Sequence, residues 1–177
     1  MLQLAVKESL LEGAFIPAHP LALNEDKTLD EVSQRALTNY YIEAGVGGIA
    51  VGVHTTQFEI RDRQFNLYEK VLRLVMEEVN KANVASSFIK IAGVCGPVEQ
   101  AIKEAKLAKS LGYALVLLSM GGLHELSEQV LIERTKEVAE IIPVVGFYLQ
   151  PSVGGLVFSY DFWCQLSEIK QLYAIKI

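Results

Sequence analysis

The sequence predicts an α/β fold in which helices cover a parallel β-sheet. Short apolar runs alternate with amphipathic segments of helical length along the whole chain. Each apolar run is nearly continuous, which is typical of parallel strands that are buried on both faces. The connections between these segments are short and contain no linker, so we expect a single domain over residues 1–177.

Periodicity and turn residues predict six strands and six helices. Thr28 with Glu31 three residues later forms a capping-box pattern, and Gly45 and Gly112 stand where left-handed geometry would end a helix. The predicted strands are residues 13–18, 47–53, 88–94, 114–119, 143–149 and 172–177. The predicted helices are residues 1–13, 29–44, 65–81, 97–111, 127–141 and 160–169.

Two architectures fit this alternation. Six strands would complete an open doubly wound sheet, whereas they would leave a (β/α)8 barrel two strands short. Polar groups at the carboxyl ends of the strands favour the barrel, because barrel enzymes build their sites from the loops that follow the strands. Five of the six predicted strands end in such a group, contributed by His19, by the run His54-Thr55-Thr56, by Ser119, by Tyr148 and by Lys176.

Composition and charge exclude several classes of protein. The net charge is −5 and the basic residues are scattered, so we expect no nucleic-acid partner. No window approaches the roughly 18 apolar residues of a membrane span, and Glu8 and Glu12 interrupt any secretory signal, so we expect a cytoplasmic protein without membrane contact. Cys95 and Cys164 are far apart and form no C-x-x-C pair, so we predict neither a disulfide framework nor a metal site. We also predict no cofactor.

Lys176 is the most informative of the strand-end residues. It lies in the apolar run LYAIKI, where loss of hydration would lower the pKa of the amine and free its lone pair to attack a carbonyl. Such a lysine can form a Schiff base. Tyr148, one strand away, is a candidate proton shuttle, and the hydroxyls of Thr55 and Thr56 are candidates for holding a substrate carboxylate.

At these residues the sequence resembles the dihydrodipicolinate synthase and N-acetylneuraminate lyase family of class I aldolases. IEAGVGGIAVGVHTTQFE is similar to the stretch that leads to the family's Gly-Thr-Thr-Gly-Glu turn, and IPVVGFYLQP to its strand ending in Tyr-Asn-x-Pro. LYAIKI resembles the strand that carries the Schiff-base lysine. The resemblance implies a (β/α)8 TIM barrel that acts on a 2-oxo acid such as pyruvate. It assigns Lys176 as nucleophile, Tyr148 as proton shuttle, and Thr55 and Thr56 as carboxylate ligands.

The chain departs from the family pattern at several positions. His54 replaces the glycine before the threonine pair, and Ser119-Met120-Gly121-Gly122 replaces the segment that carries a second relay tyrosine. The arginine that in the synthases binds the second substrate is missing after Tyr148. The sequence therefore does not predict dihydrodipicolinate synthase itself. His54 becomes a candidate substrate contact, and His54 and His19 become candidates for proton transfer.

The length sets a further expectation. A barrel of this kind takes about 250 residues, so we expect 1–177 to be an incomplete TIM-barrel domain, cut short after strand six, and a homo-oligomer because unpaired strand edges invite association. The preferred hypothesis is a Schiff-base lyase that makes or breaks a carbon–carbon bond. The alternative is a non-catalytic barrel remnant that binds a ligand or partner, and an open-sheet binding domain comes third.

Overall fold

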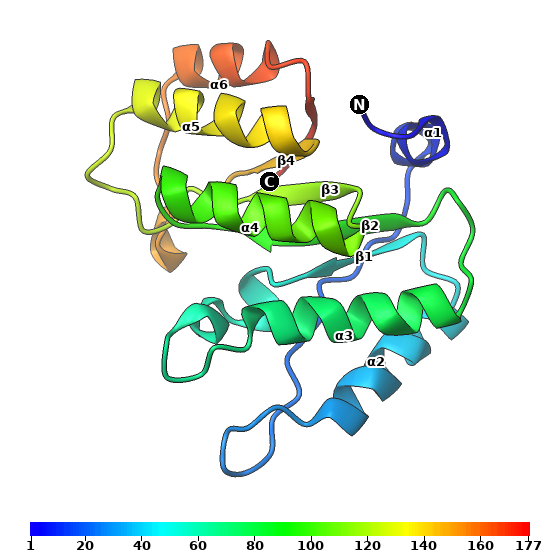
Figure 1. Cartoon of the computed structure of the whole chain (residues 1–177). Coiled ribbons are helices and arrows are strands. Elements are labelled where there is room, and N and C mark those ends of the chain that lie inside the picture. Colours follow the sequence, from blue (N-terminus) through cyan, green and yellow to red (C-terminus); the bar gives the residue numbers. More distant parts are fainter.

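Five parallel strands form one sheet at the centre of the computed structural model, which describes residues 1–177 (Figure 1). The strands are β1 (Gly48–Val51), β2 (Ile89–Val94), β3 (Leu115–Leu118), β4 (Val144–Phe147) and β5 (Leu172–Lys176). The helices are α1 (Leu4–Glu12), α2 (Glu31–Glu43), α3 (Tyr68–Lys81), α4 (Val98–Leu111), α5 (Glu128–Ile141) and α6 (Tyr160–Ser167). Short 3-10 turns lie at His54–Thr56, Phe58–Arg61 and Pro151–Val153.

The strand order decides between the two predicted architectures. The spatial order is β1-β2-β3-β4-β5, so every crossover leads to the next strand in the same direction. A doubly wound sheet reverses its order at a switch point, and no reversal occurs here. Sequential parallel strands with right-handed helical crossovers are the arrangement of a (β/α)8 barrel, which confirms the predicted fold class.

Helices α2 to α6 cover the outer face of this sheet. Figure 1 shows them following one another around the strands, with α1 lying apart near the amino terminus. Alternate strand residues such as Ile49, Val51 and Val116 point outward into a core cluster of 30 buried residues. The apolar stripe of α3 enters the same cluster through Val71 and Val75, whose side chains are fully buried. Burial of this stripe is what holds the helix on the sheet.

Helix α1 packs against the opposite, inner face. Leu2 and Val6 join Ile89 and Leu115, which begin β2 and β3, in a second cluster of 11 buried residues. The Leu2 backbone N–H also donates to the Tyr173 hydroxyl of β5 at 3.4 Å. The helix therefore covers the amino ends of the strands, and the carboxyl ends of the inner face remain open.

Two local predictions differ from the structure. Residues 13–18 form no regular strand, although the segment runs parallel to β1 and Ala18 pairs with Ala50. The His19 N–H donates to the Ala50 oxygen at 2.8 Å, whereas Pro17 has no N–H and limits the ladder. Helix α2 is capped not by Thr28 but by Asp30, whose side chain accepts a hydrogen bond from the Ser33 N–H at 3.0 Å.

No helix is long and apolar enough to cross a membrane. The structure brings together no group of three or more histidine, cysteine, aspartate or glutamate side chains that could hold a metal ion.

Candidate active site

A cavity of about 380 Å³ opens on the inner face of the sheet, toward the carboxyl ends of the strands. Its wall is mostly apolar and includes Ile91, Leu117 and Val145 from three neighbouring strands. The volume falls within the range of small-molecule sites, which are typically apolar with a few placed polar groups. Three residues supply the polar groups in this cavity, and they are His54, Thr55 and Lys176.

Lys176 enters the cavity from the end of β5. Its Nζ lies 4.4 Å from the centroid of the Phe147 ring on β4. Phe147 is buried, but Lys176 itself is exposed because no strand of this chain pairs with the far edge of β5. The apolar surroundings predicted from LYAIKI are therefore present on one side of the lysine.

The two threonines have different environments. Thr55 is exposed and lines the cavity. Thr56 is fully buried, and its hydroxyl donates to the His19 oxygen at 2.6 Å and accepts from the Gly52 N–H at 3.0 Å. The Thr56 hydroxyl is thus occupied by backbone groups, and Thr55 is the member of the pair that lines the cavity.

The two aromatic residues of the predicted site, His54 and Tyr148, also lie in different surroundings. His54 is exposed, and its ring stacks on Phe58 with the centroids 5.6 Å apart and the planes 23° apart. The Tyr148 ring lies edge-on to Trp163 of α6, with the centroids 6.1 Å apart, and it is not part of the cavity wall. The structure therefore brings Lys176, Thr55 and His54 to one cavity, but not the Tyr148 ring or the Thr56 hydroxyl.

His19 lies in a closed hydrogen-bond network beneath the Thr56 turn. Thr38 Oγ1 donates to the Gln34 oxygen at 3.0 Å, so it accepts from His19 Nε2–H at 2.9 Å. His19 Nδ1 lies 2.7 Å from Gln34 Nε2, which donates to it in the neutral ring, and 2.8 Å from the Pro20 oxygen, to which it donates only when the ring is protonated. Burial lowers the pKa of His19 and favours this neutral form. His19 is thus a fixed support of the turn, fully occupied by its partners.

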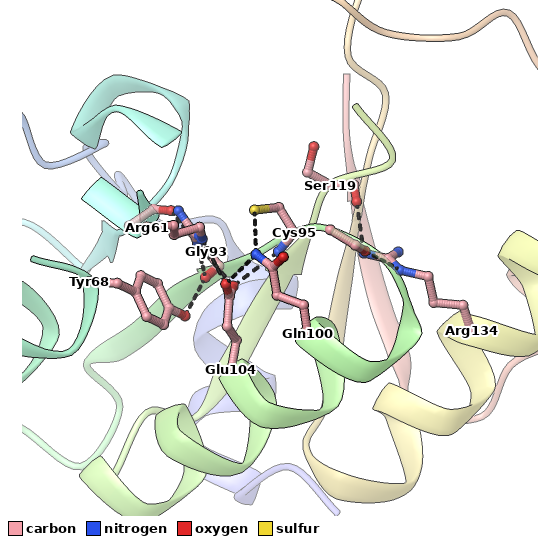
Figure 2. A network of polar contacts seen from close by, with 10 residues as sticks. Arg61, Tyr68, Gly93, Cys95, Gln100, Glu104, Ser119 and Arg134 are labelled. Atoms are coloured by element: carbon pink, nitrogen blue, oxygen red, sulfur yellow. Dashed lines mark hydrogen bonds and ion pairs between the residues drawn. The ribbon is translucent and has the colours of Figure 1, made fainter. Parts of the chain in front are cut away.

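A second polar cluster, unforeseen from the sequence, lies between the strand ends and helices α3 to α5 (Figure 2). Arg61 Nε and Nη2 approach the two Glu104 carboxylate oxygens at 2.8 and 3.1 Å, and both side chains are about nine-tenths buried. Tyr68 donates to the Gly93 oxygen at 2.7 Å, and its ring lies 4.2 Å below the Arg61 guanidinium. We call this group the rim network.

Charge balance in the rim network depends on Glu104. Burial opposes the charged form of Arg61, but its acidic neighbours outweigh burial and raise the pKa of the guanidinium. Burial also raises the pKa of the Cys95 thiol to about 11, so this thiol is neutral near pH 7. The Glu104 carboxylate is therefore the counter-charge of Arg61, and it also accepts from the Cys95 N–H at 3.2 Å.

Arg134 joins two rim loops in the same region. It is 1% exposed, and its Nε and Nη2 donate to the Gly96 and Ser119 oxygens at 2.9 and 3.1 Å. Burial lowers the pKa of Arg134 to about 10, which leaves it charged near neutral pH. The loops after β2 and β3 are thereby fixed beside an open cleft of about 890 Å³, which Arg61, Ser119 and Gly121 help to line.

Comparison with solved structures identifies proteins of the same fold. A dihydrodipicolinate synthase from Agrobacterium tumefaciens superposes with a TM-score of 0.80 at 17% identity, over 93% of this chain and 54% of that one. A chloride-inhibited dihydrodipicolinate synthase from Acinetobacter baumannii, complexed with pyruvate, gives 0.79 at 23% identity, over 92% and 54%. An N-acetylneuraminate lyase from Mycoplasma synoviae gives 0.70 at 26% identity, over 92% and 54%.

No family model and no curated protein matches the chain. The chain spans about half the length of the solved structures that it matches, and the share is 54% for each of the three described above. The structural likeness confirms the fold that the resemblance implied.

Proposed function

We propose that this chain, which has the fold of the dihydrodipicolinate synthase and N-acetylneuraminate lyase family, carries the Schiff-base lysine of a carbon–carbon lyase that acts on a 2-oxo acid. The observation that supports this proposal most directly is the cavity on the inner face of the sheet. Lys176 enters it from a strand end, among apolar residues and opposite a histidine and a free hydroxyl. Barrel enzymes place their catalytic residues at this end of the strands.

The chemistry follows from the groups that line the cavity. The neutral Lys176 amine adds to the keto carbon of the substrate, and loss of water gives an imine that withdraws electrons from the adjacent carbon. The Thr55 hydroxyl donates a hydrogen bond to the substrate carboxylate. Thr56, which the resemblance assigns to the same carboxylate, supports the turn from below through its bonds to Gly52 and His19. The role of Tyr148 as proton shuttle remains a prediction from the resemblance.

The proposed activity belongs to a barrel that has all its strands. In this chain the outer edge of β5 is unpaired, and Lys176 is exposed beside it. Further strands at this edge would remove water from the amine, which lowers the pKa of a lysine and increases the fraction of the neutral nucleophile. We therefore propose lyase activity, and assembly as a homo-oligomer, for the full-length protein.

Trapping with borohydride tests the proposal. The full-length protein is incubated with pyruvate and borohydride, which reduces an imine to a stable amine, and the protein mass is then measured. We expect a gain of one reduced substrate in the wild type and none in Lys176→Ala. Lys90→Ala is the matched control, because Lys90 also lies in an apolar strand but outside the cavity. An unchanged wild-type mass, or an adduct that survives Lys176→Ala, would contradict the proposal.

A non-catalytic binding domain is the second candidate. The exposure of Lys176 and the position of the Tyr148 ring against Trp163 favour it, because both weaken the expected catalytic geometry. A domain of this kind would gain thermal stability from a 2-oxo acid without forming a trapped adduct.

A further inference from the structure

The proposed imine chemistry needs a group that moves a proton at the carbon next to the imine. The cavity that contains Lys176 offers two other polar side chains, Thr55 and His54. A threonine hydroxyl is too weak an acid and too weak a base to take up or release a proton near neutral pH, whereas an imidazole can do both. Among the residues that line this cavity, His54 is therefore the one suited to general acid–base catalysis.

The structure leaves the His54 ring free for this task. Its nitrogen atoms have no hydrogen-bond partner within the chain, and the side chain is exposed at the mouth of the cavity. Stacking on Phe58 orients the plane of the ring without occupying either nitrogen. His19 differs in each respect, because it is fully buried and both of its ring nitrogens are bonded.

The position of Tyr148 strengthens the assignment. Strand residues alternate between the two faces of a sheet, and Phe147 and Leu149 both belong to the inner cluster. Tyr148, between them, directs its ring to Trp163 on the helical side. The phenol would have to leave that contact and cross the sheet to reach the imine.

We propose that His54 is the catalytic acid and base that interconverts the imine and the enamine, an inference that rests on the proposed Schiff base at Lys176. Neutral imidazole takes a proton from the carbon next to the protonated imine. The electrons of that C–H bond form the carbon–carbon double bond, and the electrons of the C=N bond move to nitrogen. The enamine then attacks an aldehyde carbon, and the resulting alkoxide takes the proton back from the imidazolium.

Hydrogen–deuterium exchange isolates this step from formation of the imine. The full-length protein and pyruvate are placed in D₂O, and loss of the methyl proton signal is followed by NMR. We expect His54→Gln to slow the exchange by about 10²- to 10⁴-fold, which is the usual contribution of a general base. We also expect it to keep the borohydride-trapped adduct at Lys176, which shows that the variant is folded and binds substrate.

Two further variants make the result specific. His124→Gln is the matched control, since His124 is an exposed histidine outside the cavity, and its exchange rate should equal that of the wild type. Exchange by His54→Ala should recover when imidazole is added, a rescue that a purely structural role would not show. Unchanged exchange in His54→Gln, or loss of exchange in Tyr148→Phe with His54 intact, would overturn the assignment. Absence of any adduct in the wild type would instead overturn the proposed function beneath it.

Discussion

Replacing Glu104 with alanine should lower the unfolding free energy of the protein, because Glu104 lies at the centre of the rim network. The carboxylate accepts from Arg61 Nε, Arg61 Nη2 and Gln100 Nε2 at 2.8, 3.1 and 2.8 Å, and from the Cys95 N–H at 3.2 Å. Its loss leaves a buried guanidinium without a counter-charge, and Arg61 Nη1 already lacks a hydrogen-bond partner. Removing one member of a buried ion pair costs about 3–5 kcal/mol of unfolding free energy. That is a large share of the roughly 5–15 kcal/mol of a whole domain.

Urea unfolding measures this loss, and the single tryptophan of the chain, Trp163, provides the fluorescence signal. Glu133→Ala serves as the control, because the pair of Glu133 with Lys136 is about half exposed on both sides. Exposed pairs contribute only about 0.2–1 kcal/mol. The double variant Arg61→Met/Glu104→Met should be less destabilised than Glu104→Ala alone, since it removes both buried charges together.

The reasoning fails if Glu104→Ala loses no more unfolding free energy than Glu133→Ala. It also fails if the double variant is less stable than the single one, because the unpaired charge of Arg61 would then not be the cause of the loss.

Three further predictions concern neighbouring features. Thr56→Val should lower the unfolding free energy by about 1–3 kcal/mol because it leaves the Gly52 N–H without an acceptor, whereas Thr55→Val should keep stability and weaken pyruvate binding in calorimetry. Equal stability of the two variants would contradict this difference. Burial lowers the pKa of His19 below 6.5, so the unfolded chain binds the proton first and stability should fall as the pH drops below 6.5. His19→Asn should flatten that fall in denaturation curves, and an unchanged slope would exclude His19 as its source. Hydrogen bonds led by one from a lysine lower the pKa of Glu78 from 4.5 to about 2, so this carboxylate stabilises the fold above pH 4.5 and loses that effect toward pH 2. Acid titration of Glu78→Gln should show a shallower loss, and a curve that overlays the wild type would refute the role.

Periodicity was sufficient to predict most of the fold. The sequence from Tyr68 to Lys81 has a strong apolar stripe and forms α3, and the glycine at 112 ends α4 with φ of 90°. The prediction was weakest where the chemistry of a single residue overrides the periodic pattern. Pro17 removes a donor from the first predicted strand, and Asp30, two residues after Thr28, caps α2 instead.

The sequence was sufficient to predict at which strand ends the site residues lie, but not in which direction their side chains point. Lys176 and Thr55 line the cavity as the strand ends suggested. Successive strand residues face opposite sides, so the sequence could place Tyr148 at the end of β4 without showing which face its ring occupies. Likewise, nothing in His54-Thr55-Thr56 reveals which hydroxyl the backbone of a tight turn will bind.

Some members of the rim network could have been predicted from the helical pattern of the sequence. Glu104 falls on the buried face of α4, together with Ala101, Ala105 and Ala108. Arg134 similarly shares the buried face of α5 with Leu131. A charge within an apolar helical stripe predicts a buried partner. Arg61 offered no such signal, because it lies in an irregular segment without periodicity.

Peptide mapping of the borohydride-reduced protein tests the central claim most directly. The full-length protein is treated with pyruvate and borohydride, digested, and searched by mass spectrometry for the modified lysine. The account predicts a single reduced adduct, on Lys176 in the peptide that contains LYAIKI. An adduct on another lysine, or none at all under conditions in which pyruvate is bound, would contradict it.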